Sequence, residues 1–149
     1  MAREIERKFL VRGEFRHLAE RHIKIAQGYL SVDPARVIRV RISDGKIALL
    51  SVKAPAVNTG FSRHEWEFEI TVQEAHEILK VCLPEIISKT RYIVPFRGHN
   101  FEVDVFHGKN EGLIIAELEL DTEDEFFKRP EWLGEEVTGK PEFYNSSLI

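Results

Sequence analysis

Charged and apolar residues alternate close to the start of this sequence. Glu4, Glu6 and Lys8 take every second position, and Ile5 and Phe9 fall on the opposite phase. Because side chains two residues apart in a β-strand share a face, both carboxylates and the ammonium would line one surface. Acid and base placed together in this way indicate a cation held beside an anionic ligand.

The same alternation recurs along the chain, and its charges are sorted by sign. Like charges two positions apart on one strand repel each other, so a solvated surface gains little from such doublets. A site for a divalent cation and a polyanion needs carboxylates in one region and Lys or Arg in another. The acidic sets are Glu65, Glu67 and Glu69, then Glu102 and Asp104, then Glu117 and Glu119, and the basic sets are Arg39 and Arg41, Lys53, then Lys89 and Arg91.

Strand patterns carry most of these charges. The clearest strand is 65–70, where acids alternate strictly with apolar residues. Asp44-Gly45 is a hairpin signal that pairs residues 37–42 with residues 47–53. The other predicted strands are 4–11, 90–94, 101–106 and 113–120, with turns at 97–100 and 109–112 and a loop at 54–60.

Helical patterns are fewer. Apolar residues at helical spacing predict a helix from Gln73 to Leu83, with Thr71 as its N-cap and Pro84 beyond its end. Further helical segments are predicted from Glu14 to His22, after Pro130 near Trp132 and Leu133, and as a final turn from Pro141 to Leu148.

About eight strands in meander order predict an α+β domain that is mainly antiparallel β. We expect an eight-stranded closed barrel, a tunnel with a charged interior and with helices packed outside. The apolar partners of the charged positions would then pack outward against the helices; they include Ile5, Val40, Trp66, Phe68, Val103 and Leu118. The alternative is an open sheet whose charged face is simply solvated.

Composition sets the limits on this interpretation. The 149 residues are 43% hydrophobic and 31% charged, as expected for a single globular domain over residues 1–149. The net charge of −4 gives no general attraction to nucleic acid or to an anionic membrane, so phosphate affinity would have to come from local charge. Cys82 is the one cysteine, which excludes an internal disulfide. Without an apolar signal region, we expect a cytoplasmic protein.

The ordered motifs resemble the CYTH domain, or triphosphate tunnel metalloenzyme, superfamily. The ExExK signature is present as Glu4-Ile5-Glu6-Arg7-Lys8, and its companions follow in order along nearly the whole chain. These companions are Gln27-Gly28-Tyr29-Leu30-Ser31, Arg39-x-Arg41, Lys53, Glu65-x-Glu67-x-Glu69, Lys89-Thr90-Arg91-Tyr92, Glu102-x-Asp104, Glu117-x-Glu119, Val137-Thr138-Gly139 and Asn145-Ser146-Ser147-Leu148.

The resemblance implies a tunnel that binds a triphosphate lengthwise and cleaves it with Mg²⁺ or Mn²⁺, and it also suggests a homodimer. Hard divalent cations prefer carboxylate oxygens, and Lys and Arg suit phosphate. The implied metal ligands are Glu4, Glu6, Asp104, Glu117 and Glu119. The implied phosphate-binding residues are Lys8, Arg39, Arg41, Lys53, Lys89 and Arg91. Glu67, Glu69 or Glu117 would take the proton of the attacking water, and Lys8 or Lys89 would assist the leaving phosphate.

Three functional classes are compatible with these residues. An inorganic triphosphatase is favoured because the compact chain has little sequence left to recognise a base or a vitamin. A second class keeps the tunnel for nucleoside or thiamine triphosphates, or for class IV-type adenylyl cyclase chemistry. The third is a non-catalytic module that binds polyphosphate, although such a receptor gains little from so many carboxylates without metals.

Overall fold

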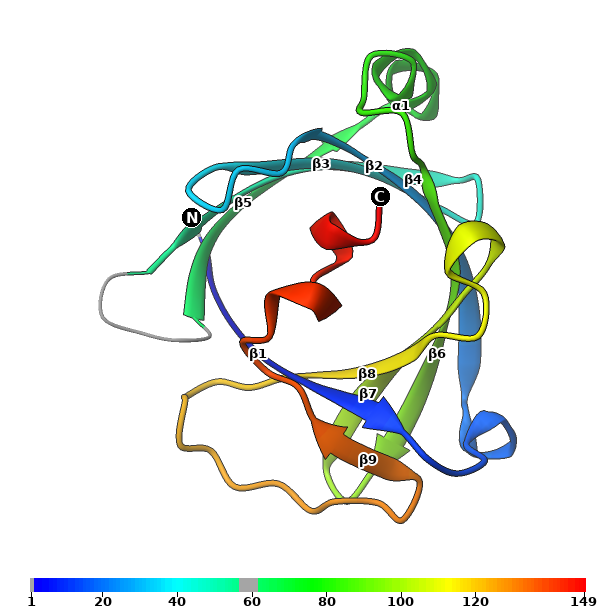
Figure 1. Cartoon of the computed structure of the whole chain (residues 1–149), viewed down its shortest axis with the longest axis vertical. Helices are drawn as coiled ribbons and strands as arrows, with labels where there is room; N and C mark the ends of the chain where they lie inside the picture. Colours follow the sequence, from blue (N-terminus) through cyan, green and yellow to red (C-terminus); the bar gives the residue numbers. More distant parts are fainter. Residues whose placement is uncertain (1, 57–61) are drawn as a thin grey trace.

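The computed structural model describes residues 2–56 and 62–149, which fold mainly as antiparallel strands (Figure 1). Together the strands supply the framework on which the charged residues are placed. They are β1 (Ala2–Val11), β2 (Arg21–Ser31), β3 (Val37–Ser43), β4 (Ile47–Pro55), β5 (Ser62–Ile70), β6 (Ile87–Phe96), β7 (His99–Phe106), β8 (Ile114–Glu119) and β9 (Leu133–Glu136).

Eight of these strands close into a barrel. The hydrogen-bonded order is β5-β4-β3-β2-β6-β7-β8-β1, and pairing of β5 with β1 joins the two ends. Closure leaves no unpaired edge within the ring, which confirms the predicted antiparallel barrel. The short strand β9 is additional, because it pairs with the end of β1 outside the closed ring.

Short helices accompany the barrel. They are α1 (Val72–Leu79) and the 3₁₀ segments η1 (Arg16–Leu18), η2 (Gly108–Asn110), η3 (Pro141–Phe143) and η4 (Asn145–Ser147). Thr71 is the N-cap of α1 as predicted, since its hydroxyl and the Glu74 side chain each accept a backbone N–H at 3.0 Å. The helix ends at Leu79 rather than at Leu83, whose N–H donates instead to the Tyr29 carbonyl of β2 at 2.8 Å.

Two predicted helices were wrong. Only the single turn Arg16–Leu18 is helical between residues 14 and 22, and Arg21 and His22 already pair with β6 as part of β2. The segment near Trp132 and Leu133 forms β9 instead of a helix, because its backbone bonds to β1. In both places, pairing with a distant strand decided the structure over the local pattern.

The hairpin and turn predictions fared better. β3 and β4 form the predicted antiparallel pair around Asp44-Gly45, both of which have positive φ, as a tight hairpin turn requires. The final turn is present as η3 and η4. The predicted loop 54–60 is only partly described: Ala54 and Pro55 extend β4, and residues 57–60 lie outside the described residues.

The outer face of the barrel carries two apolar layers. Val40 of β3 packs beneath α1, which lies outside the ring in Figure 1. Ile5, Val103 and Leu118 pack with side chains from the segment 120–133, including Phe127 and Trp132. The prediction that helices cover these positions therefore holds for Val40 alone among the four. Phe68 is 55% exposed and is not buried against a helix as expected.

A third apolar cluster includes side chains from the C-terminal segment 140–149, which lies within the outline of the ring in Figure 1. Phe143, Leu148 and Ile149 pack there against the buried side chains of the barrel. Those barrel residues are Tyr29, Val37, Ile87, Phe106 and Ile115. Among the described helices, none has the length and apolar character needed to cross a membrane.

Candidate active site

Alternation along the strands brings the predicted site residues onto one face of the sheet. Lys8 is opposite Glu117, and Glu6 is opposite Glu119, across the β1–β8 pair. The apolar residues of the other phase, such as Phe9, form the outer layers, so the charged phase faces the barrel interior. The charged side chains that are almost fully buried there are Glu4, Lys8, Arg39, Lys53, Lys89, Arg91, Asp104 and Glu117.

Two strands, β7 and β8, show that the interior is layered along the barrel. On β7 the order is Phe106 in the apolar cluster, Asp104 in an ionic layer, and Glu102 at a cavity. On β8 the corresponding order is Ile115, Glu117 and Glu119. The interior therefore passes from an apolar end, through paired charges, to an acidic mouth.

Asp104 is the centre of the densest charge cluster. Its carboxylate contacts Lys89 Nζ at 2.7 Å, and Arg91 donates to it through Nε at 2.8 Å and through a terminal nitrogen at 3.0 Å. Although burial opposes the shift, Arg91 and Lys89 lower the pKa of Asp104. Because its oxygens are already used by two cations, Asp104 orients basic side chains in this structure, and its predicted metal ligation remains a prediction.

The acids of β1 have two different environments. Glu4 is paired with Lys53 Nζ at 3.0 Å and with Arg63 at 3.1 Å, which lower its pKa although burial opposes them. Glu6 instead lies beside Glu117. Burial and the charges of Glu117 and Glu4 raise the pKa of Glu6 well above its usual range. A carboxylate crowded by other carboxylates is a place where a cation would relieve repulsion.

Glu119 extends this acidic region. Burial and the neighbouring Glu4, Glu102 and Glu65 raise its pKa. Within residues 2–56 and 62–149, no three Asp, Glu, His or Cys side chains gather closely enough to make a ready-formed metal site. The donor chemistry nevertheless fits Mg²⁺ or Mn²⁺, because Glu6 and Glu119 supply hard oxygen ligands that repel their neighbours.

The arginines of β3 are the converse of the crowded acids, because their positive charges lie together without acidic partners among the described residues. Neither Arg39 nor Arg41 forms an ion pair with another described residue, and the buried Nε of Arg39 has no hydrogen-bond partner among them. Burial and the charges of Arg39 and Arg91 lower the pKa of Arg41 to about 9. Guanidinium groups that lie inside the barrel without a carboxylate partner are poorly satisfied, and a phosphate chain would supply the missing acceptors.

The lysines differ in their access to the interior. Lys8 Nζ is 4.0 Å from Glu6 and 3.9 Å from Glu117, and its side chain is 10% exposed. The Lys89 side chain is fully enclosed between Asp104 and Asn145, whose amide oxygen it contacts at 2.7 Å. Burial lowers the pKa of Lys89 to about 7, although Asp104 opposes the shift.

The remaining predicted acids lie on β5 and are more exposed. Glu67 accepts a hydrogen bond from the Ser51 hydroxyl at 3.3 Å, and Ser51 in turn accepts one from Arg39 at 3.3 Å. This contact connects Glu67 with a phosphate-binding candidate. Glu69 lies further along the same strand face, opposite Leu49, and makes no side-chain hydrogen bond or ion pair with the described residues.

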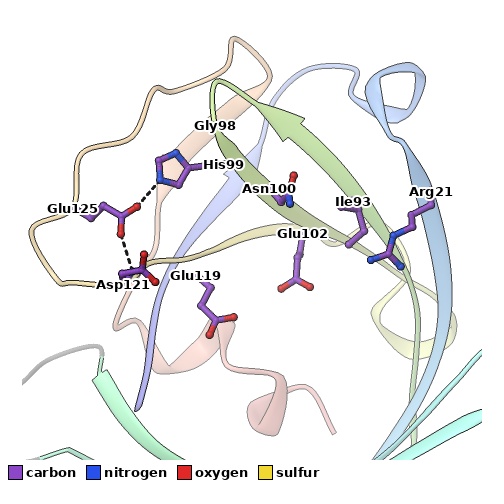
Figure 2. Close-up of a pocket in the computed structure, with 9 residues that line it drawn as sticks. All are labelled: Arg21, Ile93, Gly98, His99, Asn100, Glu102, Glu119, Asp121 and Glu125. Carbon is purple, nitrogen blue, oxygen red and sulfur yellow. Dashed lines mark hydrogen bonds and ion pairs between the residues drawn. The ribbon is translucent and has the colours of Figure 1, made fainter. Parts of the chain in front are cut away.

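A cavity of about 400 Å³ lies at the acidic mouth. Figure 2 shows Glu102 and Glu119 extending to the same side, with the contacts from Glu125 to His99 and to Asp121 at the rim. His99 Nε2 is 2.6 Å from Glu125. Glu119, a predicted site residue, and Glu102, a member of one of the acidic sets, thus border the same cavity.

Several interior residues were not predicted as site residues. Arg63 pairs with Glu4, Glu65 contacts Lys53 at 3.5 Å, and Gln27 accepts from Arg41 at 3.0 Å. The signal for Arg63 and Glu65 was the alternation itself, since both share the phase of Glu67 and Glu69 on β5, whereas Gln27 was marked only by its family-like motif. Asn145 belongs to a family-like motif of the sequence, but only the fold places it beside Lys89 and Gln27, because the C-terminal segment has no strand alternation.

Comparisons with known proteins agree with this architecture. The CYTH domain profile matches residues 2–147. An inorganic triphosphatase of Acetivibrio thermocellus is 45% identical over 150 residues, with 100% of this chain and 94% of the relative covered. An inorganic triphosphatase of Nitrosomonas europaea is 34% identical, with 97% and 95% covered. A crystal structure described as the inorganic triphosphatase NE1496 superposes with a TM-score of 0.65 at 32% identity, covering 97% of this chain and 96% of the other. Since the match includes almost every residue, the chain belongs to the CYTH domain family.

Proposed function

We propose that this protein is a divalent-metal-dependent triphosphatase that hydrolyses inorganic tripolyphosphate to pyrophosphate and phosphate. The observation that carries the proposal is the separation of charge inside the barrel. Arg39 and Arg41 lack carboxylate partners among the described residues, while Glu6 is crowded by Glu117. The region around the two arginines thus favours binding of a polyanion, and the region around Glu6 favours binding of a cation. The names of the two relatives support the same reaction class.

Binding of the phosphate chain rests on the basic residues. Arg39 and Arg41 would supply guanidinium donors to its oxygens, and Lys8 would supply a compact charge next to the acids. Lys53 and Arg91 are already paired with Glu4 and Asp104, so they would contribute through their remaining donors. Lys89 is enclosed, and we propose that it acts through the groups it contacts rather than directly.

The metal would be held by Glu6 and Glu119, with Glu4 and Glu117 beside them. A bound Mg²⁺ or Mn²⁺ supplies charge neutralisation on the phosphate and a more acidic water. The pKa of Glu117 lies well below its usual range, because Lys8 and Arg91 outweigh its burial. Such a carboxylate is a weak base, so Glu67, which the Ser51 hydroxyl connects to Arg39, is the better candidate to take the proton of the attacking water.

The reaction is then a hydrolysis in which the oxygen of water bonds to a terminal phosphorus and the anhydride P–O bond breaks. The water proton goes to the carboxylate, and the electron pair of the broken bond stays with the departing pyrophosphate. Lys8 stabilises the charge that develops there. Because its neighbours Glu117 and Glu6 raise the pKa of Lys8 although burial opposes them, it remains an ammonium through this step.

The test is phosphate release from tripolyphosphate, ATP and thiamine triphosphate, each with Mg²⁺, Mn²⁺ or EDTA. Wild type should turn over tripolyphosphate only with metal, and Glu6→Gln should lose at least about 100-fold in kcat/KM, as the loss of a directly acting charged group predicts. Glu77→Gln is the matched control, since Glu77 is exposed on α1 outside the barrel. Activity confined to ATP or thiamine triphosphate would move the protein to the second functional class. Tight binding without turnover would leave a polyphosphate-binding module.

We also propose the finer properties that the sequence predicted: a cytoplasmic location, a single domain, and a homodimer without nucleic-acid or membrane partners. The net charge of −4 and the buried basic residues Lys8, Arg39, Lys53, Lys89 and Arg91 inside the barrel support a small anionic substrate over a nucleic acid. Size-exclusion chromatography with light scattering tests the oligomeric state, and a monomer at micromolar concentration would contradict the homodimer.

A further inference from the structure

The C-terminal segment meets the charged interior at Asn145 and at its two preceding residues: the Phe143 carbonyl accepts from Lys8 Nζ at 3.5 Å, and the Tyr144 ring centroid is 5.8 Å from the same nitrogen. The Asn145 amide oxygen accepts a hydrogen bond from Lys89 Nζ at 2.7 Å and from Gln27 Nε2 at 3.0 Å. Lysine can only donate, so the oxygen of Asn145, rather than its nitrogen, faces Lys89. The opposite end of the same amide, the NH₂ group, consequently points away from these two donors.

The orientation of this amide is fixed from a second direction. Arg41 Nε donates to the Gln27 amide oxygen at 3.0 Å, and this contact leaves the Gln27 NH₂ group facing Asn145. Two basic side chains, Arg41 and Lys89, therefore hold the pair of amides in one arrangement. Asn145 itself is only partly buried, and its NH₂ group donates to no other described residue.

Behind Asn145 the barrel is filled with apolar side chains. Phe143, Leu148 and Ile149 of the C-terminal segment pack there against Phe106 and Ile115. The segment is also anchored by polar contacts, because Asn110 Nδ2 donates to the Leu148 carbonyl at 2.8 Å. A fully charged phosphate chain cannot continue through an apolar layer without a large desolvation cost, so this end of the barrel is a floor.

We propose that Asn145 is a substrate-binding residue whose NH₂ group donates to the terminal phosphate of the chain at this floor. This inference rests on the proposed triphosphate substrate. This terminal phosphate lies at the end of the chain that is remote from Glu6 and Glu119, and it is part of the pyrophosphate that is released. Lys89 and Gln27 act as positioning residues, since they hold the amide oxygen and thereby present its NH₂ group to the substrate.

Asn145→Asp separates this role from a structural one. The aspartate keeps an oxygen acceptor for Lys89 and Gln27 but loses the NH₂ donor and places a negative charge at the floor. A hydrogen bond to a charged group contributes roughly 1.5 to 3 kcal/mol, so the KM for tripolyphosphate and the Kd measured by calorimetry should rise about tenfold or more. The melting temperature should not fall. A purely structural Asn145 predicts instead that the KM and the Kd of Asn145→Asp stay at the wild-type values.

Two further variants complete the experiment. Asn145→Ala should weaken binding less than Asn145→Asp, because it adds no negative charge. Asn110→Asp loosens the same segment without touching Lys89 or Gln27, and it should leave the KM within about twofold of wild type, within the scatter expected for a distant site. If Asn110→Asp raises the KM as much as Asn145→Asp, or if Asn145→Asp binds tripolyphosphate like wild type, the inference is wrong.

The inference and the proposed function can fail separately. Tripolyphosphate that binds wild type but not Asn145→Asp, without turnover by either, would support the floor and refute the triphosphatase. Turnover by wild type with unaltered KM in Asn145→Asp would support the triphosphatase and refute the floor. A wild-type protein that neither binds nor hydrolyses tripolyphosphate would overturn both.

Discussion

Replacing Asp104 by Asn should destabilise the protein strongly, because Asp104 neutralises two enclosed cations. Its side chain is 0% exposed and contacts Lys89 at 2.7 Å and Arg91 at 2.8 Å. Removing one partner from a buried ionic cluster costs roughly 3 to 5 kcal/mol, since the remaining charges lose their compensation. The asparagine keeps the size of the side chain and one acceptor, so the loss reports the missing charge and not a cavity.

The measurement is urea unfolding followed by circular dichroism, in phosphate-free buffer near neutral pH. Glu102→Gln is the matched control, because Glu102 contacts the same Arg91 at 3.3 Å but has a 32% exposed side chain. Solvent screens such a pair, and the control should lose less than about 1 kcal/mol. Equal losses in the two variants, with unchanged dependence on urea, would refute the argument that burial decides the strength of these charges.

Two further results are expected. Arg41→Gln should raise the KM for tripolyphosphate about tenfold or more, because one charge-assisted contact with the substrate is lost. The free energy of unfolding should stay equal or rise, because Arg41 is repelled by Arg39 and Arg91. A large loss of stability in thermal unfolding would contradict this. Glu136→Gln should reduce the free energy of unfolding less in acid than at neutral pH. Hydrogen bonds from Arg7, chiefly, lower the pKa of Glu136 to about 2, so its carboxylate contributes about 1 to 2 kcal/mol of stability after allowing for its partial exposure. This contribution is complete above the unfolded pKa near 4.5 and is lost as the pH falls toward 2. The difference between wild type and Glu136→Gln in urea titrations should therefore shrink below pH 4, and a difference that grows there would show that the sign is wrong.

The architecture was largely readable from local patterns. Strict alternation in residues 65–70 and the Asp44-Gly45 turn predicted strands and a hairpin that the structure contains. Such signals are local, since the pleat fixes which residues share a face and the turn fixes the register. The errors arose where pairing is long-range. The chain around His22 and Leu133 became strand because distant partners on β6 and β1 satisfied its backbone.

For the site, the sequence by itself determined which charges share a face, because a two-residue period leaves no choice of side for Glu4, Glu6 and Lys8. It also determined the family through the order of its motifs. Closure of the barrel decided the rest, since only the tertiary structure brings charges from separate strands together. It made Asp104 a partner of Lys89 and left Arg41 without an ion pair among the described residues. It also placed Asn145 at the floor, where contacts from the far end of the chain, rather than any local pattern, give an amide its orientation.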